Sequence, residues 1–156
     1  ISAVGWPSYY IEDHTWMVQA FEGHVISLVC EGTFEKFPDL RVVMLEGGFA
    51  WLPALMWRLD KNYRGLREEV PWLKRLPSEY IRTHLRSSTQ PMEDPPNPQH
   101  LLQIIDMIGQ DHFLMFATDY PHWDFDAPDR AVPSVIKGEL REKIMWKNAA
   151  ELYELQ

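Results

Sequence analysis

Phe113-Leu-Met-Phe-Ala-Thr-Asp-Tyr-Pro-His122, followed directly by Trp123-Asp-Phe-Asp126, is the stretch around which the chain can be interpreted. Its first part is a short apolar run that ends in turn residues, which predicts a strand buried on both faces. Asp119 would then follow the carboxyl end of that strand, where parallel α/β folds place their ligands. An isolated acid at this point could simply cap the next segment, and His122 could be a surface residue. Because acids and ring nitrogens crowd together here, we expect a functional role for Asp119.

The length and composition predict one domain that covers residues 1–156. The chain has 156 residues, of which 46% are hydrophobic and 24% charged, so it can bury a sizeable core. A net charge of -8 argues against nucleic acid as a partner, because that partner needs a basic face. No apolar run is long enough to span a bilayer. The single Cys30 cannot form an internal disulfide, and we interpret it as a buried, unreactive thiol in a cytoplasmic protein.

Hydrophobic periodicity and turn residues predict three strands that alternate with helices. The strands are expected at 40–45, 85–90 and 113–118. The helices are expected at 12–36 (interrupted near Gly23 or Gly32), 49–66, around 78–83, 98–109 and 138–153. Alternation of this kind means parallel strands joined by crossover connections. Three strands cannot close a barrel, and a complete eightfold barrel needs about 250 residues. The fold class is therefore α/β, the C-terminal portion of a (β/α)8 TIM barrel with about three parallel strands and flanking helices.

Polar residues follow each predicted strand at its carboxyl end. They are Glu46, the pair Thr89 and Gln90, and Asp119. Parallel strands share one rim, so residues far apart in sequence would converge on one pocket. Glu46 could be a metal ligand or a general acid or base, or it could favour the dipole of the helix that follows.

His14 is a third candidate for the pocket. Together with Glu12 and Asp13 it could form a fragment of a metal site, although a charged helix start with Asp13 near the N-cap is the simpler interpretation. We interpret Arg58 and Asp60 as a structural or solvated ion pair. The chain contains no His-x-His, His-Glu-x-x-His or Cys-x-x-Cys motif, so a complete metal site cannot be written from these residues alone.

Several longer motifs resemble the amidohydrolase-related (amidohydrolase 2) superfamily, in particular the branch that contains aminocarboxymuconate-semialdehyde decarboxylase. The resemblance covers roughly residues 25–155. It rests on Phe34-Glu-Lys-Phe-Pro-Asp-Leu-Arg-Val-Val-Met-Leu-Glu-Gly-Gly48, Trp51-Leu-Pro, Arg58-Leu-Asp60, Phe116-Ala-Thr-Asp-Tyr-Pro-His122, Leu140-Arg-Glu-Lys-Ile and Asn148-Ala-Ala-Glu-Leu-Tyr153.

The resemblance implies a metal-dependent barrel that hydrolyses or decarboxylates a small organic acid or cyclic substrate. It implies a divalent metal, often zinc, with Asp119 as the metal ligand at the end of the last strand and as a proton shuttle. The family's His-x-His on the first strand and its metal-binding His on the fifth would both lie before Ile1, and Glu46 stands where many members have a His at the end of the sixth strand. We therefore expect that the chain is the later part of a longer polypeptide, that the metal belongs to the full-length protein, and that this piece alone is inactive.

Two other interpretations remain open at this point. The chain could be a catalytically inert, truncated paralogue that acts through association, either with itself as a homo-oligomer or with a missing N-terminal half. It could also be a binding module for an anionic small molecule, with Arg86 as a clamp for phosphate or carboxylate.

Overall fold

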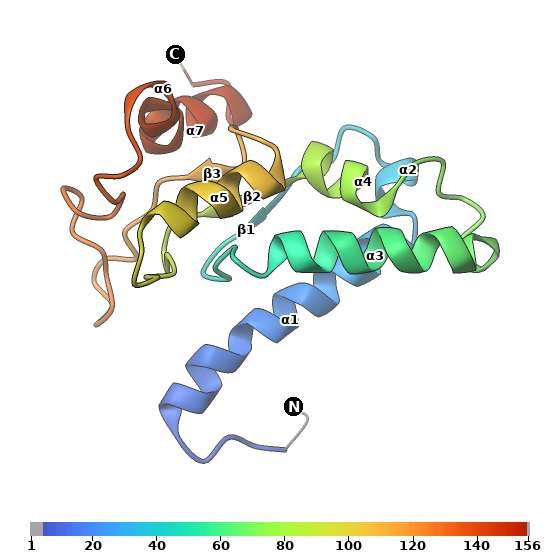
Figure 1. Ribbon diagram of the computed structural model, residues 1–156, viewed down its shortest axis with the longest axis horizontal. Helices are drawn as coiled ribbons and strands as arrows, with labels where there is room; N and C mark the ends of the chain where they lie inside the picture. The colour runs from blue at the N-terminus through green and yellow to red at the C-terminus, as the bar shows by residue number, and fades with distance from the viewer. Residues whose placement is uncertain (1–4, 156) are drawn as a thin grey trace.

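The computed structural model describes residues 5–155, so the expectation attached to the chain start at Ile1 lies outside the described residues. A small parallel sheet forms the centre and helices pack around it (Figure 1). The strands are β1 (Val42–Met44), β2 (Leu85–Ser88) and β3 (Leu114–Met115), in the order β1-β2-β3. The predicted parallel α/β arrangement is confirmed.

The register of the sheet brings the three carboxyl ends to one rim. Val42 pairs with Leu85, Met44 with Ser87, and Ser88 with Met115. Each strand therefore ends within a residue or two of its neighbour, and the loops that follow all leave from the same edge.

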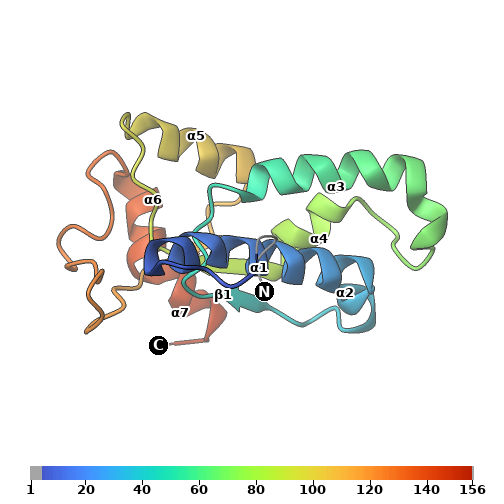
Figure 2. The same cartoon turned by 90° about the horizontal axis from the view of Figure 1, so that it is seen from below.

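Nine helical segments connect and cover the strands within residues 5–155. They are α1 (Tyr10–Cys30), α2 (Thr33–Lys36), α3 (Leu52–Leu66), the short 3-10 turn η1 (Arg67–Glu69), α4 (Pro77–His84), α5 (Gln99–Ile108), α6 (Gly138–Glu142), the π-helical turn η2 (Lys143–Lys147) and α7 (Asn148–Leu152). Helix α3 packs against α4 and α5, and α7 and η2 pack against β3. The first turns of α1 project from the body, and seen from below this helix crosses the molecule (Figures 1 and 2). None of the described helices is long and apolar enough to cross a membrane.

The first predicted helix is interrupted at one of the two expected glycines. Gly32 has φ 69°, a left-handed conformation that glycine adopts without a steric penalty, and it separates α1 from α2. The alternative break at Gly23 is wrong, because Gly23 lies inside α1.

The strand predicted at 113–118 is shorter than expected, because other partners take its backbone groups. The Phe116 N–H donates to the Ile144 carbonyl at 2.9 Å, and the Ala117 N–H donates to Thr89 Oγ1 at 3.1 Å. The chain therefore leaves the ladder two residues after Leu114 and turns over the rim. The final predicted helix is also divided, since η2 places a π turn between α6 and α7.

The core lies where the helices meet the sheet. Its fully buried large side chains are Tyr80, Phe34, Phe49, Phe113, Leu52, Met56, Ile81, Leu85, Leu101, Ile108, Ile136 and Ile144. Cys30 is only partly buried, and burial raises the pKa of its thiol, which keeps it protonated and unreactive at neutral pH.

A buried histidine stacks on a phenylalanine ring and forms hydrogen bonds near the amino end of the sheet. His84 is 1% exposed and stacks on Phe34 with ring centroids 4.4 Å apart. Its Nδ1 lies 2.8 Å from the Leu40 carbonyl and its Nε2 lies 3.2 Å from the Arg75 guanidinium. A neutral ring that donates from Nδ1 and accepts at Nε2 satisfies both contacts. Burial and the neighbouring arginines lower the pKa of His84, which favours this neutral form.

This histidine predicts a loss of stability in mild acid. Because its folded pKa lies below the unfolded value of about 6.5, the unfolded chain binds more protons as the pH falls through that value. The contribution of His84 to the free energy of unfolding should be complete above about pH 6.5. It should decrease as the pH is lowered further, with a slope of up to about 1.4 kcal/mol per pH unit. Urea unfolding between pH 7.5 and 5 measures the effect.

Replacing the buried ring separates this contribution from other titrations. His84→Gln should flatten the pH dependence, whereas His100→Gln, a change at an exposed histidine, should leave it as in the wild type. An unchanged slope in His84→Gln would show that the buried ring is not its source.

Candidate functional site

One cavity of about 420 Å³ opens at the carboxyl ends of the strands. It is lined by residues from α1 and from the loops after β1, β2 and β3. These are Tyr10, His14, Thr15, Met17, Val18, Glu46, Gly47, Gly48, Gln90, Pro91, Met92, Glu93, Asp119, His122, Trp123 and Asp124. All three candidates from the sequence, Asp119, Glu46 and His14, therefore share one cavity. Their chemical roles remain predictions.

Asp119 lies on the loop after β3, which is held by its own backbone bonds. The His122 N–H donates to the Asp119 carbonyl, and the Asp126 N–H donates to the Thr118 carbonyl, both at 2.9 Å. Asp119 has φ 59°, which is unfavourable for a residue with a side chain. Its carboxylate Oδ2 accepts from His122 Nδ1 at 2.7 Å. The Asp119 side chain is 17% exposed and that of His122 is 63% exposed, so the pair joins the cavity to solvent.

Glu46 occupies the corresponding position after β1 and is strained in the same way. Its φ is 64°, and its N–H donates to Ser88 Oγ at 3.2 Å, which joins this turn to the end of β2. Non-glycine residues in this conformation cost of order 1–3 kcal/mol and cluster at functional sites. Both candidate carboxylates therefore lie on backbone that the surrounding structure holds in an unfavourable conformation.

The turn after Glu46 requires its two glycines. A Cβ on Gly47 would lie 2.8 Å from the Phe21 ring, and one on Gly48, whose φ is 59°, would lie 2.6 Å from Glu93 Oε1. That same oxygen accepts from the N–H groups of Phe49 and Ala50 at 2.9 and 2.8 Å. Glu93 thus fastens the loop after β2 to the turn that leads into α3.

His14 reaches the cavity from α1 and contacts the loop after β3. Its Nε2 lies 3.2 Å from Asp124 Oδ2, with side chains 33% and 18% exposed respectively. The rings of Tyr10 and Trp123 pack on each other and on His14, and Trp123 Nε1 lies 3.4 Å from the Tyr10 hydroxyl. The predicted pocket position of His14 agrees with this geometry. The charged helix start is confirmed, because Glu12 and Asp13 both lie in the first turn of α1, next to the N-cap Tyr9. Glu12 accepts the N–H groups of Ser8 and Tyr9 at 2.8 Å.

The cavity is acidic. Four carboxylates and two imidazoles line it, and none of its described lining residues is Lys or Arg. Burial and the nearby Asp124 carboxylate raise the pKa of Asp126 just behind this wall. A cation or hydrogen-bond donors would complement such a site, and an anion would need a positive group from elsewhere.

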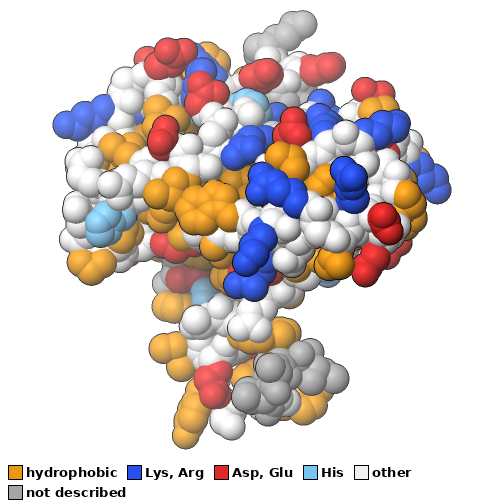
Figure 3. Space-filling model, turned by 45° about the vertical axis from the view of Figure 1, so that its right-hand side comes forward, with side chains coloured by type: hydrophobic (Ala, Val, Ile, Leu, Met, Phe, Trp, Pro, Cys, Tyr) orange, Lys and Arg blue, Asp and Glu red, His pale blue; other side chains and the backbone are white. Residues whose placement is uncertain are grey.

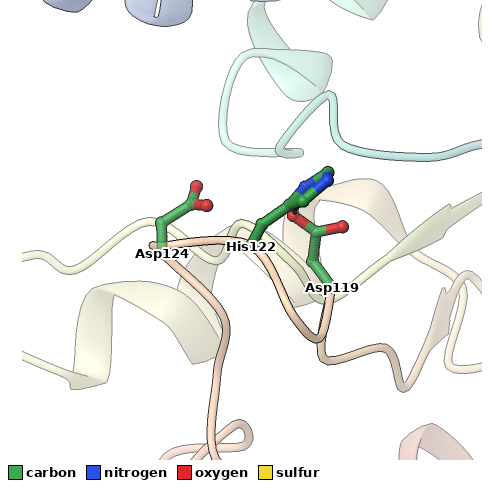
Figure 4. A group of neighbouring side chains, drawn as sticks. All are labelled: Asp119, His122 and Asp124. Atoms are coloured by element: carbon green, nitrogen blue, oxygen red, sulfur yellow. Dashed lines mark hydrogen bonds and ion pairs between the residues drawn. The ribbon is translucent and has the colours of Figure 1, made fainter.

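Three of these residues can offer donor atoms to one metal ion. Ligand atoms of Asp119, His122 and Asp124 all lie within 4.8 Å of one another. Figure 4 shows the three side chains on a single loop, with Asp119 and His122 directed toward each other and Asp124 beside them. Carboxylate oxygen and imidazole nitrogen suit divalent ions such as Mn²⁺ and Zn²⁺, so the donor set fits the metal implied by the sequence resemblance.

Other residues singled out in the sequence have structural contacts elsewhere. Asp60 does not form the predicted pair with Arg58 but accepts from the Ser78 N–H and hydroxyl, which places it at the start of α4. Arg86 lies outside the cavity and donates to the carbonyls of Thr83 and Leu85. Burial lowers its pKa, as does the nearby Arg41. A role for Arg86 as an anion clamp at this cavity is therefore wrong.

Sequence patterns alone assign no role to Glu93, His122 or Asp124. Glu93 lies in a Pro-rich loop and forms its contacts with residues more than forty positions away. Asp124 meets His14 only because α1 folds back onto the loop. The clustering of acids after the last strand was the available signal for His122 and Asp124.

Comparison with known proteins gives consistent matches. A family model described as Amidohydrolase matches residues 8–155. The gamma-resorcylate decarboxylase of Polaromonas sp. (strain JS666) is 29% identical over 153 residues, which cover 92% of this chain and 45% of that protein. The chain thus spans less than half the length of this curated relative.

Solved structures agree with this comparison. The crystal structure of a dihydroxybenzoic acid decarboxylase from Polaromonas sp. JS666, with bound manganese and the inhibitor 2-nitroresorcinol, superposes with a TM-score of 0.68 at 26% identity, covering 92% of this chain and 45% of that one. The 5-carboxyvanillate decarboxylase from Sphingomonas paucimobilis gives a TM-score of 0.67 at 25% identity, with 90% and 41% covered. The architecture is therefore part of a TIM-barrel-like fold, as predicted.

The close approach of Gly48 to Glu93 predicts a large effect of a small substitution. Gly48→Ala adds a strained left-handed residue and displaces the carboxylate that binds two backbone N–H groups. We expect a loss of about 2 kcal/mol in the free energy of unfolding. Gly23→Ala, in a helix with open space around it, should be stabilising by up to about 1 kcal/mol. Equal effects of the two changes in denaturant unfolding would contradict this account of the turn.

Proposed function

The chain belongs to the amidohydrolase family, and we propose that it forms the metal-binding C-terminal part of a non-oxidative decarboxylase that acts on a small aromatic acid. The similar proteins support this proposal, because the gamma-resorcylate, dihydroxybenzoic acid and 5-carboxyvanillate enzymes all carry the name decarboxylase. Hydrolysis of a related cyclic substrate is the alternative within the family. This chain spans 45% of its curated relative, and we propose that the activity belongs to a longer protein of which the chain is a part.

The convergence of donor atoms in the cavity carries the proposal. Asp119, His122 and Asp124 approach one another within 4.8 Å at the end of β3, with Glu46 and His14 in the same cavity. A solved relative contains manganese, which supports a divalent metal for this family. We propose Asp119 as a metal ligand, with His122 and Asp124 as the further donors on this chain, and we leave manganese and zinc as alternatives.

A divalent metal supplies positive charge and Lewis acidity, which this acidic cavity lacks and which an aromatic acid substrate needs. The charges that line the cavity are consistent with a metal that supplies the positive charge and carboxylates that bind the metal. The carboxylates of the chain can hold a cation, while none of the described lining residues is a Lys or Arg that could hold the substrate's carboxylate.

The residues of the chain would supply the proton. In a decarboxylation the bond between the ring carbon and the carboxyl carbon breaks, carbon dioxide leaves, and a proton replaces it on the ring. We assign the delivery of this proton to Asp119. Where His122 is not itself a metal ligand, its ring, 2.7 Å from the Asp119 carboxylate and 63% exposed, would return a proton from solvent to Asp119.

Glu46 and His14 would contribute from the other walls of the cavity. Glu46 follows β1, which β2 separates from β3 in the sheet, and it is our second candidate for a general acid or base. His14 holds Asp124 at 3.2 Å and so helps to position the loop that carries Asp119. The single domain over 1–156 and the cytoplasmic location remain predictions.

Metal binding by Asp119 can be tested on this chain. Titration with Mn²⁺, followed by calorimetry or by the manganese EPR signal, should show affinity that falls at least about 10-fold in Asp119→Asn, because one charged ligand is lost. Asp129→Asn is the matched control, since Asp129 lies in the same loop with a side chain 75% exposed and outside the cavity. Equal Mn²⁺ affinity in wild type and Asp119→Asn would rule out the assigned role.

A second proposal concerns association, and it rests on the edge of the sheet. β1 is an edge strand of the three-stranded sheet. A groove beside it is lined mainly by apolar residues, namely Phe21, His24, Val25, Ser27, Leu28, Val42, Val43 and Met44. Edge strands with apolar surroundings pair readily with another chain. We propose that the remaining part of the barrel covers this edge in the longer protein.

Sedimentation velocity of the isolated chain tests this second proposal. An uncovered edge should give self-associated species whose fraction rises with concentration, and Val43→Lys on β1 should shift the distribution toward monomer because an edge charge opposes pairing. A compact monomer at all concentrations would contradict it.

A further inference from the structure

The cavity contains a buried hydrogen-bond acceptor that no described residue uses. Gln90 follows β2 and is 2% exposed. Its Nε2 donates to the Asp124 carbonyl at 3.0 Å, whereas its Oε1 is buried without a hydrogen-bond partner among the described residues. The orientation of the amide is determined by this contact, because the Asp124 carbonyl can only accept. A buried acceptor left unpaired is costly, so it is expected to serve a partner.

A second acceptor in the same cavity is also unpaired. Glu93 uses Oε1 to bind the N–H groups of Phe49 and Ala50, while its Oε2 is buried and has no partner among the described residues. Gln90 and Glu93 both line the cavity, and each has one buried oxygen without a hydrogen-bond partner among the described residues. The occupant should carry hydrogen-bond donors of its own, since the lining residues described have no Lys or Arg.

The other residues that line the cavity indicate the shape and polarity of the ligand. Met17, Val18 and Met92 provide apolar surface, and the rings of Tyr10 and Trp123 provide aromatic surface. A volume of about 420 Å³ suits a small ligand. A flat apolar ring with a hydroxyl group matches these walls and the neutral amide oxygen better than an aliphatic or purely charged molecule does.

We propose that Gln90 is a specificity-determining residue, whose carboxamide oxygen accepts a hydrogen bond from a hydroxyl group on the aromatic ring of the ligand. Its other group, Nε2, holds the Asp124 carbonyl and so keeps the loop after β3 in place beside that ring. The inference rests on the proposed function in one respect, that this cavity is the substrate pocket.

The test compares two ring ligands of similar shape in two proteins. Resorcinol can donate from its hydroxyls, whereas 1,3-difluorobenzene is nearly isosteric and cannot. Binding of each to the wild-type chain and to Gln90→Met is measured by ligand-observed NMR in the presence of a chelator. Wild type should bind resorcinol about 10-fold more tightly than 1,3-difluorobenzene. Gln90→Met should reduce that preference to about 2-fold or less. Because Met also lacks the Nε2 bond to the Asp124 carbonyl, the readout is the ratio of the two affinities within each protein, in which a general weakening cancels.

Each other outcome overturns the proposal. A preference for resorcinol that is unchanged in Gln90→Met places the hydroxyl acceptor elsewhere. Equal weakening of both ligands shows that Gln90 only supports the loop. Absence of binding, or absence of a preference for resorcinol in the wild type, shows that the cavity does not recognise ring hydroxyls.

A measurement on the wild type avoids dependence on the folding of the variant. The side-chain carboxamide carbon and Nε2 protons of Gln90 should shift when resorcinol is added and should remain unchanged with 1,3-difluorobenzene. Shifts of equal size with both ligands would overturn the proposal. Because these experiments are free of metal, they can succeed when Asp119 fails to bind Mn²⁺, and they can fail when it binds.

Discussion

The parallel pairing of β2 between β1 and β3 is the constraint on which the site depends. Their register ends all three strands at one rim, where the loops that carry Glu46, Gln90 and Asp119 leave the sheet. Glu46 and Asp119 are more than seventy positions apart along the chain, and the shared edge brings both, with Gln90, to one cavity. The family match and the superposition on solved decarboxylases are consistent with this arrangement.

Hydrogen bonds between the rim loops then hold the walls of the cavity in place. The Glu93 carboxylate joins the loop after β2 to the turn before α3, and the Gln90 amide joins it to the loop after β3. His14 adds a contact from α1, whose first turns project from the body and carry exposed hydrophobic side chains such as Tyr10 and Ile11. Figure 3 shows hydrophobic side chains on this projection. The left-handed backbone at Glu46 and Asp119 is sustained by these contacts, as is usual where function requires an unfavourable conformation.

The sequence was sufficient for the fold and for the main members of the site, because both depend on local patterns. Apolar runs bounded by turn residues located β1 and β3, a more polar segment that stops before Pro91 located β2, and an acid after β1 and after β3 made Glu46 and Asp119 candidates. It was insufficient where a role depends on tertiary contacts. Asp60 was paired with Arg58 because the two are close in sequence, yet it binds Ser78. The early end of β3 follows from a bond between Phe116 and Ile144, which strand periodicity cannot reveal.

The central claim is that the loop after β3 holds a divalent metal inside the cavity. Crystals of the chain soaked with Mn²⁺ and recorded at a wavelength that gives an anomalous manganese signal test it most directly. The account predicts one strong anomalous peak within bonding distance of the Asp119 carboxylate, on the side that faces Glu46. A strong peak elsewhere on the chain with none at Asp119 would contradict it.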